Sequence, residues 1–148
     1  MSSTTAPHSP NSNTEGVGLR QLFTFLVDVT TPVSVGPSPQ GEVRMVPIVG
    51  GSFSGEYSGV VLSGGNDWQV VRADGCIEIS ARYLLKTEAG EIIEVHSDGL
   101  RSGPIPYFRT AMRFRTVAPR LDALNNLLAV AYGQRREKQV ELVVYAVL

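Results

Sequence analysis

The stretch Asn66 to Thr87, NDWQVVRADGCIEISARYLLKT, constrains the fold more than any other part of the chain. Two runs of alternating side chains flank the dipeptide Asp74-Gly75. Asp-Gly between such runs is the strongest short signal for a β-hairpin, because glycine readily adopts the positive φ that a tight type I′ turn requires. The sequence therefore predicts a hairpin whose two-residue turn sets the register of both strands.

The predicted turn pairs Asp67 with Arg82, and the strand period of two then sorts the side chains onto two faces. One face is mainly apolar and carries Trp68, Val70, Arg72, Ile77, Ile79, Ala81 and Tyr83. The other face is mainly polar and carries Asp67, Gln69, Val71, Glu78, Ser80 and Arg82. If the polar face points into the protein it is a candidate site, and if it points outward it is ordinary surface.

The rest of the chain also consists of short strand-like segments separated by turn residues. Strands are predicted over Gln21 to Val29, Arg44 to Phe53, Ser52 to Leu62, Glu91 to Ser97, Tyr107 to Thr116, Ala129 to Tyr132 and Gln139 to Leu148. Thr31 to Gly41, with three prolines, is predicted to be a loop, and Pro47 to confine its strand to an edge or a bulge. Pro119 to Asn125 is predicted to form one helical turn.

About eight or more short strands with at most one or two helical turns indicate an all-β fold, either an antiparallel sandwich or a closed barrel. The last strand, VELVVYAVL, is too apolar to be left as a free sheet edge. A single antiparallel β-barrel is therefore favoured. In a barrel the two strand faces become outer wall and lumen.

Length and composition fit one globular domain, since the chain has 148 residues, 43% of them hydrophobic and 18% charged. Residues 1–18 are rich in Ser, Thr, Asn and Pro and are predicted to be a disordered N-terminal tail, which leaves residues 19–148 for the barrel. No segment resembles a spanning helix or a secretory signal, so a cytoplasmic location is the default expectation.

Several partners and cofactors are not expected. A formal net charge of −1 gives no electrostatic footprint for nucleic acid or for an anionic membrane. The lone Cys76 and the lack of Cys/His ligand spacing argue against a metal site, and no dinucleotide-binding fingerprint is present. The expected partner is therefore a small-molecule ligand or substrate, without a cofactor.

A set of motifs resembles the domain-of-unknown-function 3237 family. The family's pattern is matched, at its spacing, by Gly64-Gly65, Asp67-Trp68-Gln69, Arg72-x-Asp74-Gly75 and Ala81-Arg82-Tyr83. The resemblance covers most of the chain from Leu19 to Leu148. It implies an antiparallel β-barrel, often paired into homodimers, and it brings no settled reaction.

Candidate site residues are groups that exchange protons, stabilise an oxyanion or contact a ligand. The candidate catalytic residues are Asp67, Arg82, His96 and Tyr107, and the candidate substrate-binding residues are Trp68, Gln69, Glu78, Tyr83 and Arg109. Plainer interpretations stay open: His96 as a surface histidine, Asp67 with Arg82 as an ordinary cross-strand ion pair, and Trp68 and Tyr83 as core.

Because no nucleophile elbow or metal-ligand spacing is visible, the chemistry that fits these residues is cofactor-free proton transfer. The leading hypothesis is an isomerase, lyase or cyclase acting in the barrel lumen on a small, partly apolar carbonyl compound, such as a secondary or aromatic metabolite. On this hypothesis Arg82 is the expected partner of a ligand carboxylate or a developing enolate. A non-catalytic ligand-binding protein and a purely structural dimer are the alternatives.

Overall fold

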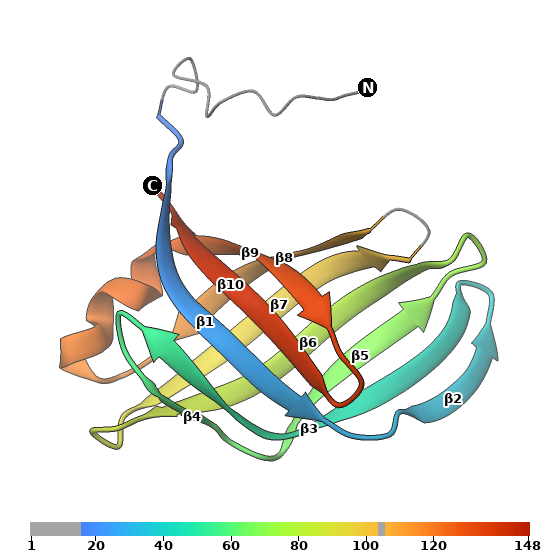
Figure 1. The fold of residues 1–148 in the computed structure, drawn as a ribbon, viewed down its shortest axis with the longest axis horizontal. Coiled ribbons are helices and arrows are strands. Elements are labelled where there is room, and N and C mark those ends of the chain that lie inside the picture. The colour runs from blue at the N-terminus through green and yellow to red at the C-terminus, as the bar shows by residue number, and fades with distance from the viewer. Residues whose placement is uncertain (1–15, 104–105) are drawn as a thin grey trace.

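Ten β-strands form one antiparallel sheet in the computed structural model, which describes residues 16–103 and 106–148 (Figure 1). The strands are β1 (Leu19–Val29), β2 (Val33–Ser38), β3 (Gly41–Gly55), β4 (Gly59–Val61), β5 (Gly65–Val71), β6 (Cys76–Thr87), β7 (Ile92–Ser102), β8 (Tyr107–Arg115), β9 (Leu128–Arg135) and β10 (Gln139–Val147). A short 3-10 helix, η1 (Pro119–Asn126), connects β8 to β9, where one helical turn is predicted.

The sheet closes on itself because β1 pairs with β10 along one edge and with β3 along the other. The order around the barrel is β1, β10, β9, β8, β7, β6, β4 with β5, and β3. The strands β4 and β5 both lie between β3 and β6, and β2 pairs with β3 beyond the end of β1. The prediction of a closed antiparallel barrel is confirmed.

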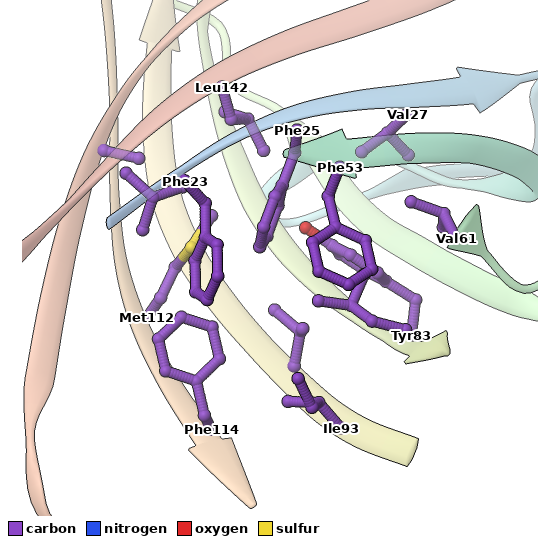
Figure 2. Packing of buried hydrophobic residues seen from close by; sticks show 14 of the residues in the cluster. Phe23, Phe25, Val27, Phe53, Val61, Tyr83, Ile93, Met112, Phe114 and Leu142 are labelled. Carbon is purple, nitrogen blue, oxygen red and sulfur yellow. The ribbon is translucent and has the colours of Figure 1, made fainter. Parts of the chain in front are cut away.

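Apolar side chains fill the half of the barrel that lies toward η1. The aromatic cluster consists of Phe23, Phe25, Phe53, Tyr83 and Phe114, whose rings contact one another edge to face or at a tilt (Figure 2). Buried Leu121 and Leu124 of η1 belong to the same core. The helix lies at one end of the barrel, and the β2–β3 and β5–β6 turns lie at the other (Figure 1).

Of two predictions near the prolines, the loop is wrong, and the strand with Pro47 at an edge or bulge is present but longer than predicted. The segment predicted as a loop over residues 31–41 contains β2, which pairs with the first part of β3. The strand predicted over residues 44–53 extends from 41 to 55 as β3, and it runs through Pro47. The carbonyl oxygen of Pro47 accepts a hydrogen bond from the Thr30 amide, 3.2 Å away, in the short connection between β1 and β2. The missing N–H of Pro47 therefore faces a gap in the neighbouring strand, where it removes no ladder bond.

The predicted register of the β5–β6 hairpin is also wrong, by one residue. Asp67 lies opposite Ala81 instead of Arg82. The Gly75 amide donates to the Arg72 carbonyl at 3.0 Å, and the Arg72 amide donates to the Cys76 carbonyl at 2.9 Å. These bonds enclose a three-residue loop, a type I turn followed by a glycine at φ +87°, instead of the two-residue type I′ turn. A one-residue shift moves every side chain of β6 to the opposite face relative to β5.

The turn itself supplies a stability prediction. Gly75→Val is expected to destabilise the protein by about 1–2 kcal/mol or more, because a β-branched residue is strained at positive φ. A Cβ at this position meets no atom within 4 Å, so backbone strain is the only cause. Urea unfolding measures the effect, with Gly103→Ala as the control, because Gly103 has open space around it and no left-handed φ. Equal stability of both variants would contradict the left-handed backbone conformation of Gly75.

Two further expectations concern the ends and surroundings of the chain. The predicted disordered tail, residues 1–18, falls almost wholly on residues 1–15, which lie outside the described residues. Within residues 16–103 and 106–148, no helix has the length and apolar character needed to cross a membrane.

Candidate functional site

A cavity of about 90 Å³ occupies the half of the barrel away from η1, and we call it the lumen cavity. Most of its wall is apolar, with side chains such as Val27, Val46, Ile48 and Leu142. The polar side chains that line it are Arg44, Asp67, Gln69, Tyr83, Ser97, Arg101, Thr110 and Arg135. They come from β3, β5, β6, β7, β8 and β9, so the site exists only once the barrel has closed.

A line of hydrogen bonds fixes the carboxylate of Asp67 in this wall. The Nε of Arg44 donates to Oε1 of Gln69 at 2.8 Å, and Nε2 of Gln69 donates to Oδ2 of Asp67 at 2.7 Å. The main-chain amide of Ser80 donates to Oδ1 of Asp67 at 3.2 Å. Each carboxylate oxygen therefore has one protein donor and keeps acceptor capacity for a ligand.

Burial raises the pKa of Asp67 from an ordinary value of 3.8 to about 6. The hydrogen bonds from Gln69 and Ser80 oppose this rise, and so do the positive charges of Arg101 and Arg44. A carboxyl group with a pKa near 6 is ionised at neutral pH and is a stronger base than an exposed aspartate. Such a group is suited to proton transfer.

Two buried hydroxyl groups complete the inner part of the cavity. Tyr83 Oη and Thr110 Oγ1 have no hydrogen-bond partner within the described residues, although both side chains are buried. Burial, with a contribution from the negative charge of Asp67, raises the pKa of Tyr83, so its hydroxyl keeps its proton. Buried polar groups normally have partners, so hydroxyls without one at a cavity wall are candidates for contact with a ligand.

Three half-buried arginines line the outer part of the cavity. Arg101 extends from the end of β7, and its guanidinium lies 5.9 Å from the centre of the Phe108 ring. Nη1 of Arg135 donates to the main-chain carbonyls of Arg136 and, at 2.8 Å, of Glu137. Burial, followed by repulsion from Arg135 and Arg44, lowers the pKa of Arg101. All three arginines line the same cavity.

The structure brings three of the predicted site residues into the lumen cavity: Asp67, Gln69 and Tyr83. The other predicted residues face outward: Trp68, Glu78, Arg82, His96, Tyr107 and Arg109. The one-residue register shift explains Glu78 and Arg82, because it places the polar face of β6 on the outer wall. The predicted pairing of Asp67 with Arg82 is therefore wrong, and Arg82 pairs with Glu94 at 3.0 Å.

The outward-facing candidates form two groups on the wall. Trp68, Arg82 and His96 line an outer groove of about 530 Å³ over β5, β6 and β7. Arg109 lies with its guanidinium 5.0 Å from the centre of the Tyr107 ring, beside a second, more apolar outer groove.

Five polar lining residues are not among the predicted site residues: Arg44, Ser97, Arg101, Thr110 and Arg135. Strand phase could have identified several of them. Ser97 continues the buried series of Ile93 and Val95, and Thr110 precedes buried Met112 with the same period of two. A polar residue in the apolar phase of a strand indicates a lumen position.

No group of three His, Cys, Asp or Glu side chains in the described ranges is arranged to hold a metal ion. In the described lining of the cavity, Asp67 is the only acidic side chain. The polar groups present there, a carboxylate, guanidiniums and hydroxyls, suit an organic ligand that carries oxygen atoms.

The fold and the cavity together define a small, closed antiparallel β-barrel protein with a polar site in its lumen. Residues 17–106 and 106–147 match the family described as protein of unknown function (DUF3237). The chain belongs to this family, as the sequence motifs predict.

Relatives of known sequence and structure align with this chain over nearly their whole length. A UPF0311 protein from Clostridium acetobutylicum is 29% identical over 92% of this chain and 98% of its own. The crystal structure of a conserved protein of unknown function from Rhodopseudomonas palustris is 32% identical, covers 91% of this chain and 100% of its own, and superposes with a TM-score of 0.87. A structure described as an enzyme from Penicillium herquei shares the fold at 23% identity and a TM-score of 0.76, over 93% of this chain and 99% of its own.

Proposed function

We infer that this protein is a cofactor-independent enzyme that transfers a proton on a small, partly apolar carbonyl compound held in the lumen cavity. One observation carries the proposal: a buried carboxylate, Asp67, with a pKa raised to about 6, lies in the wall of a cavity whose lining residues also include Tyr83 and Thr110, each with an unpaired buried hydroxyl. Isomerases, lyases and cyclases of this kind share one first step, removal of a proton from the carbon beside a carbonyl group.

Asp67 acts as the general base in this step. Its raised pKa increases its proton affinity while leaving it ionised at neutral pH. A positioned general base contributes about 10²–10⁴-fold to the rate. The hydrogen bonds from Gln69 and Ser80 hold the carboxylate in one orientation. A fixed orientation favours removal of a proton from one defined position of the substrate.

The hydroxyls and arginines stabilise the negative charge that develops on the carbonyl oxygen. Tyr83 and Thr110 are buried O–H donors without another partner in the described structure, and we assign them to the enolate oxygen. The cations Arg44 and Arg101 add a positive potential in a partly desolvated site. Donors that are fixed before the reaction stabilise a transition state at little reorganisation cost.

The lining limits the chemistry to a single acid–base group. Among the described lining residues Asp67 is the only carboxylic acid, and no histidine is present. The proton that Asp67 removes is therefore returned by Asp67: to another carbon of the substrate in an isomerisation, to the departing group in an elimination, or to the oxygen of the attacked carbonyl group in a ring closure. The description of the Penicillium herquei protein as an enzyme supports catalysis on this fold.

The main alternative is a protein that binds such a molecule in the same cavity without transforming it. Deuterium exchange separates the two functions. The protein is incubated in D₂O with acetophenone and, separately, with the small molecules that copurify with it. We expect deuterium at the carbon beside the carbonyl group with the wild-type protein, and at least a hundredfold slower exchange with Asp67→Asn.

Asp98→Asn serves as the matched control, because Asp98 is an exposed carboxylate on the outer face of β7. It is expected to exchange at the wild-type rate. Recovery of bound ligand without deuterium from the wild-type protein would support the binding protein. Equal exchange rates in the wild-type protein and Asp67→Asn would exclude Asp67 as the base.

A further inference from the structure

The arginines of the lumen cavity differ from most other arginines of the protein in having no carboxylate partner. Ion pairs within 4 Å are formed by Arg20, Arg72, Arg82, Arg115, Arg120 and Arg136. Within the described residues, Arg44, Arg101 and Arg135 form no such pair. The three cations nevertheless converge on one cavity from β3, β7 and β9.

This arrangement is unfavourable for the protein alone. A partly buried cation loses hydration, and neighbouring like charges add repulsion. Both effects act on Arg101, whose pKa is lowered by burial and by the charges of Arg135 and Arg44. Asp67 supplies at most one negative charge against three positive ones in the described lining.

The arginines are also held with N–H donors to spare. Arg44 uses Nε for Gln69, and Arg135 uses Nη1 for main-chain carbonyls. No hydrogen bond from the Arg101 guanidinium is present among the described residues, and the Phe108 ring lies beside it. Guanidinium groups with spare donors match the two oxygens of a carboxylate.

We propose that the ligand of the lumen cavity carries a carboxylate group, which binds Arg101 and Arg135 with Arg44 beside them, while its carbonyl-bearing apolar part extends inward. The apolar part then contacts Val46 and Ile48, and the reacting carbon lies toward Asp67. This inference rests on the proposed function, which places the substrate in the lumen cavity. It adds the chemical class of the substrate, an oxo acid.

The test compares levulinate, a small oxo acid, with levulinamide, which has nearly the same shape and no charge. Binding is followed by NMR through the arginine Nε–H resonances, and a melting curve is recorded for each variant. We expect the wild-type protein to bind levulinate at least tenfold more tightly than levulinamide. Arg101→Met should lose at least tenfold in levulinate affinity and leave levulinamide binding unchanged.

Arg113→Met is the matched control, because Arg113 is exposed on the outer face of β8. It is expected to bind both compounds like the wild-type protein. Arg101→Met loses an unpaired cation and is expected to fold, and Arg135→Met provides a second variant at the same site. Inorganic phosphate is titrated as a further anion, and we expect weaker binding than that of levulinate.

The inference would be overturned by equal affinities of the wild-type protein for levulinate and levulinamide, by unchanged levulinate affinity in both variants, or by no saturable shift at tens of millimolar levulinate. Stronger binding of phosphate than of levulinate would also overturn it, in favour of a phosphate-bearing ligand. Since binding needs no turnover, a failure of deuterium exchange rejects the proposed enzyme without changing this result.

Discussion

Asp67→Asn is expected to be more stable than the wild-type protein at neutral pH, although it lacks the proposed base. The pKa of Asp67 is about 6 in the folded protein and 3.8 ordinarily, so folding favours the protonated carboxyl group. The stabilising contribution of this proton is fully present below about pH 3.8 and is lost as the pH rises through about 6. The shift corresponds to about 3 kcal/mol.

Asparagine carries no charge at this position, so the variant does not lose stability as the pH rises. Its NH₂ group, however, points at a hydrogen-bond donor of the protein. Both oxygens of Asp67 accept hydrogen bonds, from Gln69 and from Ser80, so one bond becomes a contact between donors. That mismatch costs about 1 kcal/mol, and the variant should gain about 2 kcal/mol at neutral pH. The gain should shrink as the pH falls toward 4.

Urea unfolding of both proteins across this pH range measures the difference. The exposed control Asp98→Asn should follow the wild-type pH dependence. A stability difference between Asp67→Asn and the wild type that stays constant with pH would mean that the carboxyl group of Asp67 does not have its raised pKa. A variant that is more stable than the wild-type protein but inactive is expected when the wild-type protein keeps a buried charge for its function.

Phe25→Ala is expected to produce the largest loss of stability, about 3–5 kcal/mol. Phe25 is fully buried, and its ring centre lies 5.5 Å from that of Phe23, 6.1 Å from that of Phe53 and 6.3 Å from that of Tyr83 (Figure 2). Removal of the ring leaves a void among neighbours that cannot all move inward, because they are fixed on three strands of a closed sheet, β1, β3 and β6.

The urea midpoint gives the magnitude of this loss, and Val35→Ala gives the comparison. Val35 lies on β2 and is 69% exposed, so its truncation should change the stability by about 0.5 kcal/mol or less. A loss of about 1 kcal/mol or less for Phe25→Ala would show that the aromatic cluster collapses around the gap and does not act as a rigid core.

Much of the fold follows from alternation along single strands. The alternation of Phe23, Phe25, Val27 and Val29 predicts the buried face of β1, and all four side chains are buried. The last strand is too apolar for an exposed edge, and it is paired on both sides as β10. These predictions succeed because the period of two within a strand depends on the backbone geometry of that strand alone.

The site was harder to predict, because it depends on relations between strands. A three-residue turn ending in Gly75 and a two-residue turn with the same Asp-Gly dipeptide differ by one position in register. That difference moved Arg82 out of the site and left Asp67 in it. The convergence of Arg44, Arg101 and Arg135 depends on barrel closure, and no local pattern in the sequence contains it.

The filled half of the barrel limits the route between solvent and the proposed site. The helix η1 lies at one end of the described barrel (Figure 1), and the aromatic cluster fills that end. On the proposed function, the substrate therefore enters toward Asp67 from the arginine end, and the product leaves by the same path. Charges that draw an anionic substrate inward also retain an anionic product. On the proposed function, departure of the product competes with arrival of the next substrate, and the rate of release depends on whether the reaction alters the group that faces the arginines.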